Sequence, residues 1–250
     1  MRLADFIIGG APRSGTSWLW HLADRHPGLA MAKPLRPEPK FFLIDELYNK
    51  GADYYSATWF ADLPETVLVG EKSTNYLEGV GVAARIKETI PDVRLIFLLR
   101  NPVERAYSNY GWSRKNGMEN EGFMQALLLE EQREAELPAA LRYARPHAYF
   151  SRGLYADLLA PFFALFPREQ ILIVRTEEIA QHPTLVAEKL HRFLGIEVRA
   201  QDALGLAPIN QLPPGEPLPE DARSWMLERY AEPNRRLAAL LGGDFVPWFI

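Results

Sequence analysis

A glycine-rich loop directly after a short apolar run is the feature that most constrains this chain. The run is Phe6-Ile7-Ile8, and the loop reads Gly10-Ala11-Pro12-Arg13-Ser14-Gly15-Thr16-Ser17. A glycine, four residues, a second glycine and then hydroxyl residues is the spacing of a phosphate-binding loop between a strand and a helix. Backbone N–H groups of such a loop and of the following helix surround an anion. The sequence therefore predicts an anion site at the end of the first strand.

The loop lacks the lysine of nucleoside triphosphate sites. Thr16 follows the second glycine, at the position of the lysine that reaches the β- and γ-phosphates of ATP or GTP. The loop's own cation is Arg13, two residues before Gly15. We interpret the loop as a nucleotide-anion site that is not built for a triphosphate.

Strand and helix patterns alternate along the rest of the chain. Apolar runs predict strands at 5–9, 67–69, 95–99 and 171–174, and helical spacing predicts helices at 14–25, 81–90, from 102 onward, and at about 121–136, 152–165, 183–194 and 219–241. This alternation predicts an α/β fold, a single P-loop-like domain over residues 1–250 with a central parallel sheet flanked by helices. Ligands of such sheets bind beyond the carboxyl ends of the strands.

Two more polar clusters follow predicted strands. Glu71-Lys72-Ser73-Thr74 comes after the second strand, and Arg100-Asn101 comes after the third. A magnesium-dependent NTPase or kinase needs an acid at the end of a buried strand, whereas this strand ends in a cation suited to a second phosphate. Ser108 lies two turns into the next helix and would join Arg100 on that anion. The alternative is a surface salt bridge for Arg100 and a solvated Ser108.

Composition excludes several classes of protein. The net charge of -4, from 28 basic and 32 acidic residues, argues against a general nucleic-acid binder. The 250 residues include no cysteine, so disulfides, thiolate metal sites and cysteine nucleophiles are excluded, and a cytoplasmic location is expected. We also expect no signal peptide and no membrane span, since no apolar run approaches about 20 residues.

The motifs resemble those of sulfotransferases that use 3′-phosphoadenosine 5′-phosphosulfate (PAPS). Residues 12–18 resemble the family's 5′-phosphosulfate loop, and LLRNPVERAYSNY, which contains Arg100 and Ser108, looks like its 3′-phosphate motif. Residues 71–76 and 151–155 resemble the heparan-sulfate-type branch and its bacterial relatives. The resemblance runs in order over about residues 5–200.

This resemblance implies roles for individual residues. Arg13 would contact the bridging oxygen and the sulfuryl group, and Trp18 would contact the adenine or pack in the helix core. The residues that would surround the 5′-phosphate are Ser14, Gly15, Thr16 and Ser17, and those that would bind the 3′-phosphate are Arg100 and Ser108. The resemblance implies PAPS as cofactor and no metal.

Glu71 is the predicted general base. Sulfuryl transfer to an alcohol needs the hydroxyl proton removed during in-line attack, and Glu71 follows a strand beside the loop. A salt bridge from Glu71 to Lys72 or Arg13 is the alternative. His147 is a minor alternative base.

The acceptor side is expected to involve two lysines. Lys72 would contact the sulfuryl oxygens or hold Glu71 ionised, and Lys40, in a proline-rich loop at 31–42, would face the acceptor unless it is a solvated charge. Nearby aromatic residues would line an acceptor pocket or belong to the core, namely Tyr48, Tyr54, Tyr55 and Trp59.

One segment departs from the family pattern. The family's late loop sets a basic residue beside glycine over the 3′-phosphate, whereas residues 207–215 read APINQLPPG without a cation. The acidic net charge also favours a small or neutral acceptor over a long sulfated polysaccharide.

The sequence thus predicts an enzyme that transfers a sulfuryl group from PAPS to a hydroxyl of a small-molecule, lipid or sugar acceptor. A P-loop kinase with a degenerate loop and a non-catalytic nucleotide-binding module are the alternatives. The acceptor and the oligomeric state do not follow from the sequence.

Overall fold

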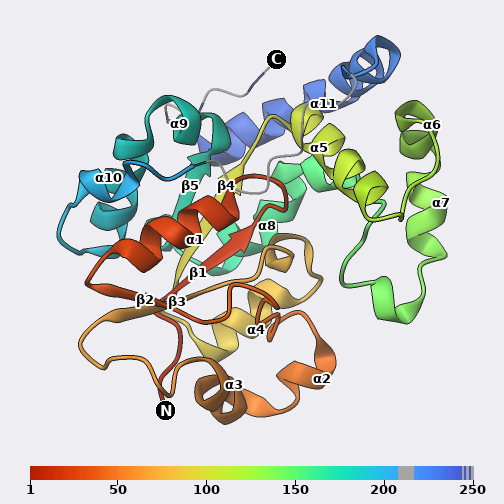
Figure 1. Ribbon diagram of the computed structural model, residues 1–250. Coiled ribbons are helices and arrows are strands. Elements are labelled where there is room, and N and C mark those ends of the chain that lie inside the picture. Colours follow the sequence, from red (N-terminus) through yellow and green to blue (C-terminus); the bar gives the residue numbers. More distant parts are fainter. Residues whose placement is uncertain (208–216, 244, 246–247, 249–250) are drawn as a thin grey trace. The chain divides into compact units, whose positions relative to one another are not determined.

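The computed structural model describes residues 1–207, 217–243, 245 and 248 (Figure 1). The chain divides into two compact units, Met1–Leu99 with Pro161–Asn210 and Arg100–Ala160 with Gln211–Ile250. The expectation that residues 1–250 act as one domain stays a prediction.

The first unit is built on a five-stranded parallel sheet (Figure 1). Its strands are β1 (Phe6–Gly10), β2 (Leu29–Met31), β3 (Leu68–Lys72), β4 (Arg94–Leu99) and β5 (Ile171–Arg175), in the order β2-β3-β1-β4-β5. In β1 every residue is buried, and in β4 all but the first. Continuous burial of this kind is typical of parallel strands covered on both faces, so the predicted α/β class is confirmed.

Helices flank this sheet. They are α1 (Thr16–Arg25), α2 (Asp45–Tyr48), α3 (Gly51–Trp59), α4 (Val82–Thr89), α9 (Thr176–Gln181) and α10 (Pro183–Leu194), with α8 (Tyr155–Leu165) running from the second unit into the first. Leu19 and Leu22 of α1 and Leu190 of α10 pack with Ile96 and Leu98 in one core cluster. This packing fixes the start of α1 against the sheet, which is where the glycine-rich loop ends.

The second unit is helical. It contains α5 (Pro102–Lys115), α6 (Phe123–Leu128), α7 (Glu130–Ala135) and α11 (Glu220–Leu241). Its core joins Val103 and Tyr110 of α5 to Phe123, Tyr149 and Tyr230. Nowhere in the described residues is a helix both long and apolar enough to cross a bilayer.

Several elements differ from the prediction. The helix expected at about 121–136 is divided at Leu129 into α6 and α7. The edge strand β2, with three residues, is too short for a local pattern and forms through its pairing with β3. The helices α2 and α3 lie in a stretch for which the sequence predicted no helix or strand.

Candidate functional site

The turn from β1 into α1 has the backbone of an anion-binding loop. Arg13 (φ +68°) and Gly15 (φ +90°) are both left-handed, on either side of Ser14. Left-handed residues between right-handed ones turn successive N–H groups toward one concavity, which binds anions. Residues other than glycine seldom adopt a left-handed backbone conformation, so the loop holds the Arg13 backbone in a conformation that is unfavourable for arginine.

The N-terminus of α1 adds to this concavity. Gly15 is its N-cap residue, no side chain caps the helix, and no acidic residue lies in its first turn. The first N–H groups of a helix have no partner within the helix and carry partial positive charge. Thr16 and Ser17 are both buried there.

Ser14 supplies an independent sign of a ligand. Its side chain is fully buried, and its Oγ has no hydrogen-bond partner among the described residues. Buried polar atoms are almost always hydrogen-bonded, so this hydroxyl fits a site completed by a ligand. The loop is preformed, because Thr176 Oγ1 lies 2.7 Å from Ser14 O and 3.1 Å from Leu99 O and ties the loop to β4 and α9.

Trp18 lies in the core. The ring is buried in the cluster that joins α1 to the sheet, and its Nε1 donates to Leu206 O at 3.4 Å. This is the second of the two roles predicted for Trp18. Contact with an adenine stays a prediction.

Glu71 is enclosed at the end of β3, which pairs with β1. It is fully buried; its Oε1 accepts from the hydroxyls of Tyr55 and Tyr76, each at 2.9 Å, and its Oε2 accepts from Ser73 Oγ at 2.7 Å. Burial raises the pKa of Glu71 to about 7, although these three hydroxyl donors act to lower it. Such a pKa suits a general base, but the burial that raises it also keeps the carboxylate from solvent.

This arrangement differs from the prediction for Glu71 and its neighbour. Glu71 was expected where an acceptor hydroxyl arrives, yet hydroxyls of the protein itself occupy both of its oxygens. Lys72, the partner considered for Glu71, instead forms an ion pair with Glu38. Of the predicted aromatic residues, Tyr55 belongs to the core and is a partner of Glu71.

Glu38 is a site residue that sequence reasoning missed. Its Oε1 pairs with Lys72 Nζ, and its Oε2 accepts from Thr74 N and from Thr74 Oγ1, each at 3.1 Å. The Lys72 side chain is 2% exposed and that of Glu38 is 12% exposed, so the acid is the more open partner. The sequence did contain a sign of it, because Glu38 is the one acidic residue in the proline-rich segment 31–42, whose other charged residues are all basic.

Lys40 lies at the same end of β3. Its backbone N donates to Ser73 Oγ at 2.9 Å, and its Nζ donates to Asn75 Oδ1 at 3.3 Å. Glu38, Lys40 and Lys72 therefore gather after β3, beside the strand that leads into the anion loop. The structure brings both predicted lysines to one edge of the sheet.

Arg100 and Ser108 belong to the second unit. Arg100 follows β4 directly, and its carbonyl accepts from the Tyr155 hydroxyl at 2.9 Å. Asn101 caps α5, accepting from Val103 N at 3.0 Å, and Pro102 is the first helical residue, so the predicted helix start is confirmed. Ser108 is half-buried on α5.

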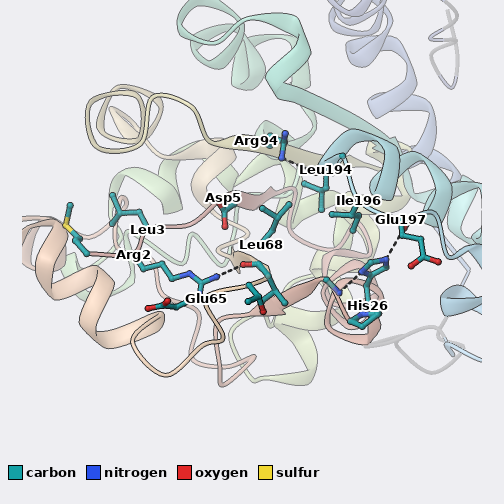
Figure 2. A pocket seen from close by; sticks show the side chains of 16 residues that line it. Arg2, Leu3, Asp5, His26, Glu65, Leu68, Arg94, Leu194, Ile196 and Glu197 are labelled. Atoms are coloured by element: carbon teal, nitrogen blue, oxygen red, sulfur yellow. Dashed lines mark hydrogen bonds between the residues drawn. The ribbon is translucent and has the colours of Figure 1, made fainter.

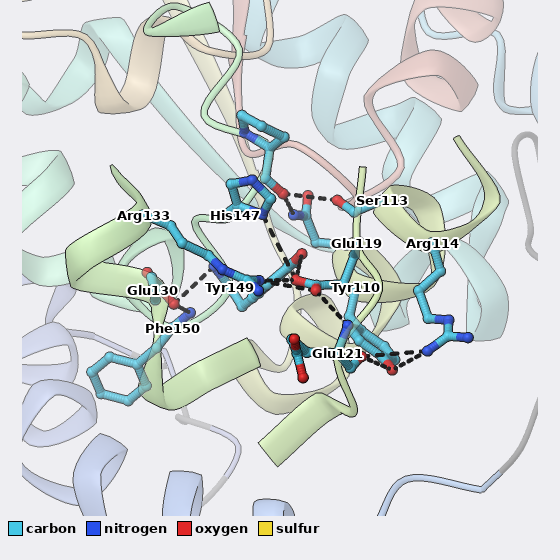
Figure 3. A network of polar contacts seen from close by, with 12 residues as sticks. Tyr110, Ser113, Arg114, Glu119, Glu121, Glu130, Arg133, His147, Tyr149 and Phe150 are labelled. Carbon is cyan, nitrogen blue, oxygen red and sulfur yellow. Dashed lines mark hydrogen bonds and ion pairs between the residues drawn. The ribbon is translucent and has the colours of Figure 1, made fainter. Parts of the chain in front are cut away.

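His147 lies in a polar network of the second unit (Figure 3). Glu119 accepts from Tyr149 Oη at 2.8 Å and from Arg133 Nη1 at 2.7 Å, and His147 Nδ1 is 3.7 Å from the same carboxylate. Burial acts to raise the pKa of Glu119, but the hydrogen bonds from Glu121 N, Arg133 and Tyr149 outweigh it, so the pKa is lowered. The network links α5, α7 and the 147–151 segment, so His147 lies among residues that hold these elements together.

A pocket of about 820 Å³ lies at the other edge of the sheet, near the amino ends of β1, β3 and β4 (Figure 2). Its polar groups serve the fold: Asp5 accepts from Val69 N at 2.7 Å, Arg94 donates to Leu194 O at 3.1 Å, and His26 Nε2 lies 2.9 Å from Glu197 O. Since the anion loop follows the carboxyl end of β1, this pocket is separate from the candidate site. Of the predicted late loop, residues 208–215 lie outside the described residues.

Comparisons with known proteins identify the family of this chain. The family model described as "Sulfotransferase domain" matches residues 3–204. Human bifunctional heparan sulfate N-deacetylase/N-sulfotransferase 2 is 30% identical over 203 residues, covering 78% of this chain and 22% of the relative. The chain thus spans about a fifth of the length of the first curated relatives it matches. The membrane-associated sulfotransferase kil1 of Dictyostelium discoideum is 23% identical, covering 97% of this chain and 66% of that protein.

Solved structures show the same fold. A sulfotransferase from Alicyclobacillus acidocaldarius superposes with a TM-score of 0.81 at 28% identity, covering 98% of both chains. Mouse sulfotransferase SULT7A1 complexed with PAP has a TM-score of 0.52 at 18% identity, covering 82% of this chain and 63% of the mouse chain, a likeness of fold alone. From its anion loop, its sheet and these matches, the chain belongs to the sulfotransferase family of enzymes.

Proposed function

We propose that this protein transfers a sulfuryl group from PAPS to a hydroxyl of a small-molecule, lipid or sugar acceptor. The observation that carries the proposal is the anion loop, in which the buried Ser14 Oγ has no partner within the described chain. The lack of a lysine after Gly15 argues against ATP or GTP. PAP, present in the mouse structure of the same fold, is what PAPS becomes when its sulfuryl group leaves.

The residues present fit this cofactor. The 5′-phosphosulfate would be held by Ser14, Gly15, Thr16 and Ser17, with Arg13 at the bridging oxygen, and the 3′-phosphate by Arg100 and Ser108. Bound there, PAPS supplies a sulfuryl group on a phosphate leaving group. Arg13 would offset the charge that develops on that leaving group, and no step requires a metal.

We infer that Glu38, rather than Glu71, accepts the acceptor's proton. A general base must come within hydrogen-bond reach of the hydroxyl, and the Glu38 side chain is 12% exposed whereas Glu71 is fully buried. The acceptor oxygen forms a bond to sulfur as the bond from sulfur to the phosphate oxygen breaks, and the hydroxyl proton passes to a Glu38 oxygen. Lys72 and Lys40 would contact the sulfuryl oxygens or the acceptor.

The names of the first curated relatives bear on the acceptor class. The curated relatives are named for N-sulfation of heparan sulfate, so a sugar acceptor is within the proposed class and a sugar amine is the first variant to assay. A cytoplasmic location and the absence of nucleic-acid partners remain predictions from composition.

Calorimetric titration with PAP in the presence of EDTA tests the cofactor. We expect stoichiometric binding that magnesium does not change, and weaker binding of ATP. A preference for magnesium–ATP with phosphoryl transfer would instead support the kinase alternative. PAP binding without turnover of any alcohol, phenol, sugar or amine in a radiolabelled PAPS assay would support a non-catalytic nucleotide-binding module.

A further inference from the structure

We propose that Glu71 is a positioning residue that fixes the segment from Glu38 to Phe42 for sulfuryl transfer. The catalytic part of this inference rests on the proposed function. The anchoring part rests on the contacts of Glu71 and can be measured without any substrate.

Two hydrogen-bond relays connect Glu71 to the backbone of this segment. In the first, Lys40 N donates to Ser73 Oγ at 2.9 Å, and Ser73 Oγ donates to Glu71 Oε2 at 2.7 Å. In the second, Phe42 N donates to the Tyr76 hydroxyl at 3.3 Å, which donates to Glu71 Oε1 at 2.9 Å. A hydroxyl has one hydrogen, so donation to Glu71 turns its lone pairs toward the backbone amide.

A third contact holds Phe41, the residue between Lys40 and Phe42. The Tyr55 hydroxyl donates to Glu71 Oε1, and the Tyr55 ring stacks on Phe41 with centroids 4.6 Å apart and an interplanar angle of 17°. Three consecutive residues, Lys40, Phe41 and Phe42, are thus each held by a hydroxyl-bearing side chain that donates to Glu71.

The anchored segment carries the charged groups of the candidate site. Lys40 and Glu38 both lie within it, and Glu38 is paired with Lys72. Lys72 follows Glu71 on β3, and neighbouring residues of a strand point to opposite faces. Glu71 therefore fixes the segment from inside the fold, while Lys72 holds Glu38 at the strand end.

The three hydroxyl groups around Glu71 all donate hydrogen bonds, so they require a hydrogen-bond acceptor at this position. The ionisable groups that face it are Tyr55 from α3, Tyr76 after β3 and, through its charge, Glu38. An ionised carboxylate accepts on both oxygens, whereas a glutamine presents N–H donors on one side. In Glu71→Gln one hydroxyl must reverse, its hydrogen loses a buried acceptor, and the relay it belongs to loosens.

Amide hydrogen exchange, followed residue by residue in NMR spectra, tests the anchoring. In Glu71→Gln we expect exchange to accelerate about tenfold, the size of one buried hydrogen bond, at the amide of the loosened relay, Lys40 or Phe42, with the amides of α10 unchanged. Tyr48→Phe is the matched control, because the Tyr48 hydroxyl bonds the exposed Glu88. Unchanged exchange at both amides in Glu71→Gln would overturn the anchoring.

Kinetics separate positioning from proton removal. We expect Glu71→Gln to lower kcat about tenfold, with PAP affinity kept and with the acid limb of the pH profile of kcat/KM still present. If that limb disappears in Glu71→Gln and persists in Glu38→Gln, Glu71 is itself the base and the inference is wrong. If the wild type transfers no sulfuryl group, the proposed function fails, while the exchange experiment still decides the anchoring.

Single-hydroxyl variants keep the test decisive if Glu71→Gln does not fold. Ser73→Ala should release the Lys40 amide, and Tyr76→Phe should release the Phe42 amide, each with a lower kcat. Variants that release these amides with kcat unchanged would refute the positioning role.

Discussion

Lys72 and Glu38 form an ion pair at the carboxyl end of β3 in which the ammonium is buried and the carboxylate is partly open. A buried lysine without a counter-charge is costly, so Lys72 holds Glu38 at this position. The pair brings an acid to the strand end beside the anion loop, where the proposed sulfuryl transfer needs a base.

Glu38→Gln should lower kcat by about 100-fold or more, because it removes the proposed base without changing the size of the side chain. PAP affinity should stay within about twofold, since Glu38 is not among the residues proposed to hold the cofactor. Steady-state kinetics and calorimetry measure the two quantities. Glu46→Gln, an exposed acid on α2, is the control, and equal kinetics for both variants would exclude Glu38 as the base.

Arg100→Ala should weaken binding of PAP at least tenfold and leave binding of 5′-AMP unchanged, because only PAP carries the 3′-phosphate that Arg100 is proposed to contact. Competition binding of the two nucleotides measures the difference. Arg192→Ala removes an exposed arginine paired with Glu188 and should affect neither ligand. Equal loss for both nucleotides would contradict a role at the 3′-phosphate.

Ser14→Ala should weaken PAP binding about tenfold while leaving the free protein as stable as the wild type, or more stable. The reason is that the buried Ser14 Oγ has no partner in the described structure, so its removal relieves an unsatisfied group. Denaturant unfolding with and without PAP measures both effects. A clear loss of stability without ligand would mean that Ser14 serves the fold.

Gly15→Ala should destabilise the protein more than Gly51→Ala. Both glycines are left-handed, but a Cβ at Gly15 would lie 2.9 Å from Ile179 Cδ1, whereas one at Gly51 meets nothing within 4 Å. Gly51→Ala therefore isolates the backbone cost, about 1–2 kcal/mol, and Gly15→Ala adds a steric contact. Unfolding free energies test the order, and PAP binding should fail only in Gly15→Ala.

The stability difference between the wild type and Glu71→Gln should fall as the pH rises from about 4.5 to about 7. The pKa of Glu71 is raised from 4.5 to about 7 by burial, so the folded protein binds more protons than the unfolded chain in this range. The stabilisation that Glu71 contributes is fully present below its pKa in the unfolded chain. It is lost as the pH rises through its pKa in the folded protein, by on the order of 3 kcal/mol.

Comparing the two proteins at each pH isolates Glu71. Burial lowers the pKa of His191 from 6.5 to about 4, which costs stability as the pH falls, but this term is common to both proteins and cancels. Denaturant unfolding between pH 4 and pH 8 gives the difference. A difference that is flat across this range would contradict a raised pKa for Glu71.

Local sequence was sufficient for the features that depend on neighbouring residues. The spacing of Gly10 and Gly15 predicted the anion loop, and the apolar run 95–99 predicted β4, because turn conformation and strand burial follow from short-range pattern. The start of α5 followed from Asn101 and Pro102. The motifs also pointed to the sulfotransferase family, which the family match confirms.

The sequence by itself determined the loop, the parallel sheet and the family. Only the tertiary structure decided which carboxylate is open and which is enclosed. Glu38 and Lys72 are 34 residues apart, and Tyr55 reaches Glu71 across 16. Burial and ion pairing are set by segments that meet only on folding, so no local pattern distinguishes the enclosed acid, Glu71, from the more open acid, Glu38.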